Sequence, residues 1–273
     1  MFQVKRRKTS FGSALAMIEL IYHATVRHVR KSHGNAVIGL LMNMLQTLVM
    51  VLIFFTMFEL LNLRRTAIRG DFLLYVMSGI FLFITHTKTV AAVSGAEGPT
   101  SPMMKHAPMN TLVAIASAAF ATLYLQILSA ALVLFIYHAA VTPITIFDWP
   151  KTFGMLSLAW FSGIGVGMVF MSARPWAPEI VSILTTVYQR MNMIASGKMF
   201  VVNTLPSSMI ALFDWNPLFH SIDQARGAIF LNYNPHYTSV SYPIYVTVVC
   251  LMIGLMLEFY TRRHASLSWS AGR

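Results

Sequence analysis

The sequence predicts an all-α membrane protein with six transmembrane helices, an N-terminal amphipathic interface helix, and a re-entrant helical pair between the fifth and sixth spans. Hydrophobic residues make up 56% of its 273 residues and charged residues only 11%, whereas soluble domains contain about 25% charged residues. The apolar residues fall in long blocks, as crossing roughly 30 Å of hydrocarbon requires. One further stretch, 206–237, is apolar but interrupted by prolines and polar residues.

The charge and the motif content exclude several function classes. The net charge is +11, but the basic residues flank apolar blocks as topology signals do. No aromatic and basic platform for single strands is present, so no nucleic-acid partner is expected. The single cysteine, Cys250, supports neither a disulfide framework nor a metal site. Because no nucleotide-binding loop, HExxH or GxSxG motif occurs, we expect a non-catalytic chain without a cofactor of its own.

The amino-terminal part, 1–34, is expected to be cytoplasmic and to contain an interface helix over 10–29. Apolar residues recur there at spacings of three and four, whereas Glu19, His23 and Arg27 fall mostly on another face. This amphipathic pattern with a basic end is typical of a helix in the headgroup plane. A helix packed on a partner protein is the alternative, and the two are compatible.

The transmembrane domain is expected over 35–262, followed by a cytoplasmic tail over 263–273. Its fourth span carries glycines at positions 163, 165 and 167, which allow neighbouring helices to approach closely. The loop over 96–110 joins the second and third spans. The six expected spans are 36–61, 72–93, 111–140, 153–172, 180–202 and 242–260.

Both termini are basic, which predicts that both are cytoplasmic and that the number of spans is even. The loop over 96–110 then faces the cytoplasm, and the broken stretch faces outward. Arg64, Arg65 and Arg69 lie in the first outer loop, against the positive-inside rule. The seven basic residues over 5–31 outweigh them.

The broken stretch is expected to form a re-entrant pair of short helices over 204–232. Each helix has a start signal: Thr204 shortly before Pro206, and Asn216 directly before Pro217. Neither apolar run is long enough to cross a bilayer. Such backbone is tolerated at membrane depth only when it is buried in protein or lines a water-filled cavity. The stretch therefore predicts a protein that lines a path.

Three ionisable residues inside the expected spans are candidates for lining that path. Arg190 lies well inside the fifth span, so it either faces a channel or pairs with a neighbour such as Glu59. His86 and Lys88 lie near the end of the second span. They either meet an anionic lipid-linked substrate or extend to the headgroups.

Three stretches, 26–58, 161–180 and 215–237, carry a resemblance to a known family. The third has the pattern Asn-Pro-Leu-x-His-x-acid-x-x-Arg and is the most specific. The chain thereby resembles, over nearly its whole length, the membrane subunit of ABC-2-type exporters that secrete capsular polysaccharide and related long glycans. It departs from the family at Asp223, where Glu is common, and over 31–39, where the match is looser.

The resemblance implies a homodimer in the bacterial inner membrane, with two cytoplasmic ATPase subunits that bind ATP and magnesium. ATP binding would drive a polysaccharide through a channel at the dimer centre, with membrane lipids and periplasmic export proteins as further partners. The loop over 96–110 resembles the coupling helix that docks on the ATPase, and exposed methionines suit such a contact. The docking residues are then Pro102, Met103, Met104, Lys105, His106 and Pro108.

The same resemblance implies an outer gate built from the re-entrant pair. Asn216 and Pro217 suit a helix cap and the first helical residue. His220, Asp223 and Arg226 share one helix face, where they either form a local ion pair or contact glycan hydroxyls. The remaining gate candidates are Trp215 and Tyr233. Tyr233 either belongs to an interface belt or stacks on a sugar ring.

Other functions remain open at the level of the sequence. An exporter subunit of this type can serve another substrate: O-antigen, teichoic acid, a lipid or a drug. A passive channel would need no ATPase partner. A membrane-embedded enzyme should show carboxylates or histidines clustered at one depth, and the sequence has no such cluster.

Overall fold

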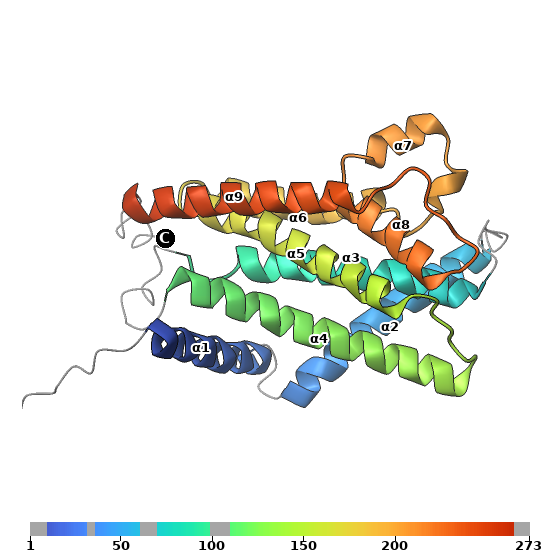
Figure 1. The fold of residues 1–273 in the computed structure, drawn as a ribbon, viewed down its shortest axis with the longest axis horizontal. Coiled ribbons are helices and arrows are strands. Elements are labelled where there is room, and N and C mark those ends of the chain that lie inside the picture. The colour runs from blue at the N-terminus through green and yellow to red at the C-terminus, as the bar shows by residue number, and fades with distance from the viewer. Residues whose placement is uncertain (1–9, 32–35, 61–69, 99–109, 265–273) are drawn as a thin grey trace, which may run out of the picture.

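The computed structural model describes residues 10–31, 36–60, 70–98 and 110–264, and within these ranges the chain is helical without strands (Figure 1). The predicted all-α class is thereby confirmed. A short 3₁₀ turn, η2 (Val202–Thr204), precedes α7. The helices are α1 (Ser10–Lys31), α2 (Ala36–Leu60), α3 (Phe72–Ser94), α4 (Thr111–Ala140), α5 (Trp149–Ala173), α6 (Pro178–Ala195), α7 (Ser207–Phe213), α8 (Pro217–Ile229) and α9 (Ser241–His264).

Five of the described helices, α2, α3, α4, α5 and α9, are long and apolar enough to cross a membrane. They correspond to the first four expected spans and the last one. Multi-pass insertion is compatible with this architecture, because each of these helices exceeds the roughly 20 residues that a span needs.

The helix expected over 180–202 is shorter than the sequence predicts. Helix α6 ends at Ala195, and Gly197 follows with a φ of 75°. A Cβ at Gly197 would lie 2.8 Å from Cδ2 of Phe219, so neither the backbone conformation nor the space admits a larger residue. The chain turns here because α8 packs against the turn, a contact that the apolar run itself does not reveal.

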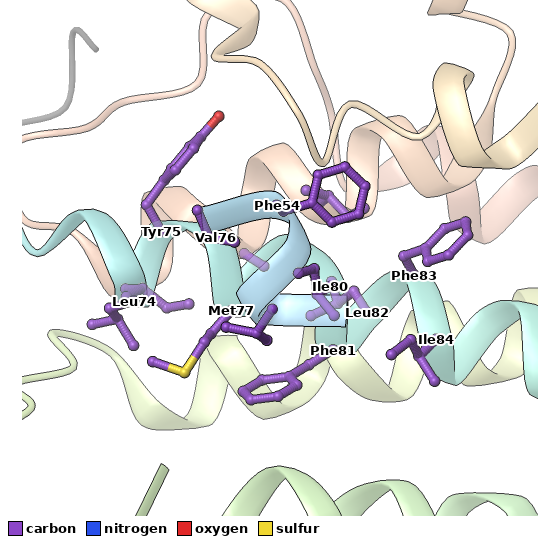
Figure 2. Packing of buried hydrophobic residues seen from close by; sticks show 14 of the residues in the cluster. Phe54, Leu74, Tyr75, Val76, Met77, Ile80, Phe81, Leu82, Phe83 and Ile84 are labelled. Carbon is purple, nitrogen blue, oxygen red and sulfur yellow. The ribbon is translucent and has the colours of Figure 1, made fainter. Parts of the chain in front are cut away.

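Helix α3 forms the centre of the bundle. In its most apolar window 78% of the residues are buried, against 28% in α2 and 22% in α9. Figure 2 shows that its side chains point to different sides of the helix, with Tyr75 on one side and Met77 and Phe81 on the other. They meet α2, α4, α5 and α8, which all pack on α3.

Helix α5 packs between α3 and α9 through its glycines. A Cβ at Gly163 would lie 2.8 Å from the carbonyl oxygen of His86, and one at Gly167 would lie 2.8 Å from Cβ of Val93, both on α3. Gly165 faces α9 instead, where a Cβ would lie 3.1 Å from Cβ of Cys250. The close helix packing that the glycines predict is thereby confirmed.

The two ends of the bundle carry different elements. In Figure 1, α7 and α8 lie toward one end, and the carboxyl end of α9 lies at the other. Helix α1 packs on α4. The broken stretch and the end of the last long helix are therefore on opposite sides of the molecule.

Candidate functional site

The two short helices that the broken stretch predicts are present as α7 and α8. Asn216 caps α8, because its side-chain Oδ1 accepts the backbone N–H of Leu218 at 3.0 Å, and Pro217 is the first helical residue. The predicted cap is thereby confirmed. Helix α7 exposes most of its side chains, whereas α8 is buried along almost its whole length.

Asn216 does more than cap α8. Its amide nitrogen donates hydrogen bonds to Oδ1 of Asn192 at 3.0 Å and to the carbonyl oxygen of Ala195 at 2.9 Å. Both acceptors belong to the last turn of α6. A single buried side chain therefore joins the end of α6 to the beginning of α8.

We predict that Asn216→Asp destabilises the protein by about 2 kcal/mol, because a carboxylate keeps the cap but turns two donated hydrogen bonds into contacts between acceptors. The measurement is the melting temperature of the purified chain in detergent. Asn110→Asp is the matched control: Asn110 caps α4 only by accepting the N–H of Val113, at 2.8 Å. Equal melting temperatures for the two variants would contradict the prediction.

Arg226 is completely buried and bonds to the turn that follows α6. Its Nη1 donates to the carbonyl oxygens of Gly197 at 2.9 Å and Phe200 at 2.8 Å, and its Nη2 donates to that of Lys198 at 2.8 Å. The guanidinium also lies 4.1 Å from the ring centre of Tyr75. The carbonyl groups that the turn leaves without backbone partners are thus satisfied by one side chain from α8.

Asp223 and His220 join α8 to the connection that leads into α9. The hydroxyl of Tyr233 donates to Oδ1 of Asp223, and that of Thr238 donates to Oδ2 at 2.7 Å. Burial raises the pKa of the Asp223 carboxyl, and the two hydroxyl donors oppose that rise. Nδ1 of His220 accepts the N–H of Ser239 at 3.1 Å, so its Nε2 carries the proton that it donates to the carbonyl oxygen of Asp214 at 2.8 Å.

We call His220, Asp223 and Arg226 the α8 anchor. The sequence placed these residues on one helix face and left a local ion pair or glycan contacts as alternatives. In the structure all three are buried and hydrogen-bonded to segments outside α8, so their polar atoms contact the protein itself. Of the gate candidates, Tyr233 is buried as well, whereas Trp215 is 47% exposed.

The sequence does not predict the partners of Arg226, namely the turn over 197–200 and Tyr75 on α3. Gly197 and Lys198 break the apolar run after α6, which was the available signal. The sequence does not indicate that an arginine far along the chain fills the turn. Lys198 is buried too, and its Nζ lies 3.7 Å from the ring centre of Phe83.

The three path-lining candidates lie in three different environments in the structure. His86 is completely buried, with Nδ1 2.9 Å from Oγ of Ser162 and Nε2 2.9 Å from the hydroxyl of Tyr188, so it joins α3 to α5 and α6. Arg190 is exposed on α6. Lys88, two residues from His86, lines a cavity among α1, α2, α3 and α4.

The six coupling candidates, Pro102, Met103, Met104, Lys105, His106 and Pro108, lie outside the described residues, as do Arg64, Arg65 and Arg69. Over the described ranges, no three His, Cys, Asp or Glu side chains lie close enough together to hold a metal ion. No protein-family model matches the chain, and no curated protein matches it either.

Proposed function

We propose that the chain is the channel-forming permease subunit of an ATP-driven exporter that moves a lipid-linked, capsular-type polysaccharide across the bacterial inner membrane. The observation that supports this most directly is the pair α7 and α8, inserted between α6 and α9 and held by the α8 anchor. In this proposal α6 is the fifth of six spans, both termini are cytoplasmic, and the pair is re-entrant at the outer face.

The hydrogen bonding of the pair suits a re-entrant position. Irregular backbone at membrane depth must find partners within the protein, because lipid offers none. Arg226 supplies such partners to the turn over 197–200, and Asp223 and His220 tie down the connection after α8. Helix α8 is thereby fixed to the bundle, so it can form a stable rim for a path rather than a mobile loop.

The proposed assembly is a homodimer of this subunit with two ATPase subunits, which bind ATP and magnesium. Helices α2 and α9 each leave most of their apolar residues unburied. This apolar surface is therefore available for contact with lipid or with a second copy of the chain. The loop over 96–110 would dock on the ATPase through Met104 and its neighbours. Movement of the polymer would then require only noncovalent contacts on this chain.

The first test is affinity purification of the tagged chain from native membranes, with identification of the proteins that copurify. We expect an ATPase chain in the wild-type sample and its loss in Met104→Glu, because a carboxylate replaces an apolar docking residue. Met209→Glu is the matched control, since Met209 is an exposed methionine on α7. A wild-type sample without any ATPase would favour a passive channel and would contradict the proposal.

The substrate is tested separately from the partner. Deletion of the chromosomal copy is expected to remove surface polysaccharide, and a plasmid copy is expected to restore it. Loss of another surface polymer, or of drug resistance alone, would assign the subunit to an exporter of O-antigen, teichoic acid, a lipid or a drug.

A further inference from the structure

A cavity of about 550 Å³ lies where α1, α2, α3 and α4 meet. Most of its wall is apolar or small, with Gly39, Met42 and Leu125 among the lining residues. Its polar part contains the ammonium group of Lys88 and the imidazole of His28, beside the amides of Asn43, Gln46 and Gln126. A mostly apolar cavity with a few convergent polar groups is the usual form of a ligand site.

The amides hold Lys88 in a defined position. Its Nζ donates to Oδ1 of Asn43, which also accepts from Nε2 of Gln126 at 3.1 Å. The amide nitrogen of Asn43 donates to Oγ of Ser129 at 2.7 Å and to the carbonyl oxygen of Leu125 at 3.3 Å. Asn43 is therefore fully engaged, whereas the ammonium of Lys88 has donors to spare for a ligand.

No acidic side chain in the described part of the chain pairs with Lys88. Within the described ranges Lys88 makes no ion pair. A cation between apolar helices is costly unless an anion or hydrogen-bonding groups offset its lost hydration. The cavity therefore presents a cation that has an amide partner and, among the residues that the structure describes, no counter-charge.

The depth of Lys88 suits the headgroup region of a bilayer. About 9 Å of helix rise separates it from Ser94, where α3 ends. Basic pockets between transmembrane helices bind the headgroups of anionic lipids. We propose that this cavity binds the phosphate headgroup of an anionic phospholipid, with Lys88 as its counter-charge and Gln46 as a neighbouring hydrogen-bond donor.

Gln46 strengthens the assignment because its side chain is exposed and has no partner among the described residues. Its amide can therefore donate to a phosphate oxygen without breaking a contact within the protein. The acyl chains would lie along the apolar wall, beside Met42 and Leu125. The site does not depend on the exporter proposal, since lipid binding is measured on the subunit alone.

The test is native mass spectrometry of the full chain, purified in detergent, delipidated and mixed with phosphatidylglycerol or phosphatidylcholine of identical acyl chains. We expect the wild-type protein to prefer phosphatidylglycerol by about tenfold, as one hydrogen bond between charged partners would provide. Lys88→Arg should keep the preference and Lys88→Met should lose it. Lys151→Met, at an exposed lysine on α5 outside the cavity, is the control and should behave as the wild type.

A second variant tests the lipid preference independently if Lys88→Met folds poorly. Gln46→Glu changes an exposed side chain that no described contact requires, and its carboxylate should repel or replace the phosphate, so the preference should again fall. Unchanged preference in both Lys88→Met and Gln46→Glu would overturn the proposal. Displacement of the lipid by millimolar inorganic phosphate would also overturn it, because the site would then belong to a soluble anion.

Discussion

Replacement of Arg226 by methionine is expected to leave little folded protein. The side chain is completely buried and donates to three carbonyl oxygens of the turn over 197–200. Methionine approximates its volume but supplies no donor, so the three acceptors would lie buried without partners. Each such group costs about 1–3 kcal/mol. The loss should therefore reach at least about 3 kcal/mol, a large part of the stability of an ordinary domain.

The measurement is the fraction of monodisperse protein after extraction and mild heating, followed by size-exclusion chromatography. Arg190→Met is the matched control, because it removes the same charge from an exposed position on α6. We expect Arg190→Met to elute as the wild type does. A monodisperse and heat-stable Arg226→Met protein would show that the guanidinium does not hold the turn. It would then reopen a direct role of Arg226 in handling the substrate.

A valine at position 163 is expected to force α3 and α5 apart. The Cβ alone would lie 2.8 Å from the carbonyl oxygen of His86 and 2.9 Å from Cβ of Thr89. The first of these atoms is helical backbone in the most buried helix of the bundle, so it cannot move aside cheaply. Overpacking of this kind typically destabilises a protein by about 1–3 kcal/mol. Because the contact is with rigid backbone, we expect the destabilisation by Gly163→Val to lie at or above the upper end of that range.

Gly154→Val is the control on the same helix. No atom lies within 4 Å of a Cβ built at Gly154, which is exposed near the beginning of α5. This variant should melt at or slightly above the wild-type temperature, since valine is a better helix former than glycine. Similar melting temperatures for the Gly163 and Gly154 variants would show that α5 can shift along α3 without cost.

These two variants also bear on function. Gly163 governs how closely α5 approaches α3, and Arg226 holds the turn between α6 and α7 against Tyr75 of α3. Helix α5 also packs on α8, so both contacts bear on the position of α8 relative to the central helix. If the pair α7 and α8 forms the rim of a path, disturbance of either contact should impair export at temperatures where the protein is still folded.

Much of the fold follows from local features of the sequence. The lengths of the apolar blocks predicted six spans, because a membrane span needs a certain number of apolar residues. Five of them are present as long apolar helices, and the one expected over 180–202 is shorter. The cap at Asn216 and the helix start at Pro217 were also predictable, since both depend on neighbouring backbone groups. The glycines on α5 predicted close packing without identifying the helices that they face.

The candidate site was predictable only in its location. A polar residue at a given helix face has several possible partners, and the sequence does not show which of them it contacts. His86 and Lys88 are two residues apart, yet one joins three helices inside the bundle and the other lines a cavity. The partners of His86 lie on α5 and α6, far along the chain, so its role depends on how those helices pack.

The sequence by itself determined five of the long apolar helices and where the chain breaks into α7 and α8, because hydrocarbon thickness and capping act over short stretches. The tertiary structure decided that α6 ends at Ala195 and that Arg226 points inward to the turn over 197–200. It also left Lys88 facing a cavity in which no described acidic side chain pairs with it. The physical reason is that a buried polar group takes whichever partner packing brings within reach. That partner is the turn over 197–200 for Arg226 and Asn43 on α2 for Lys88.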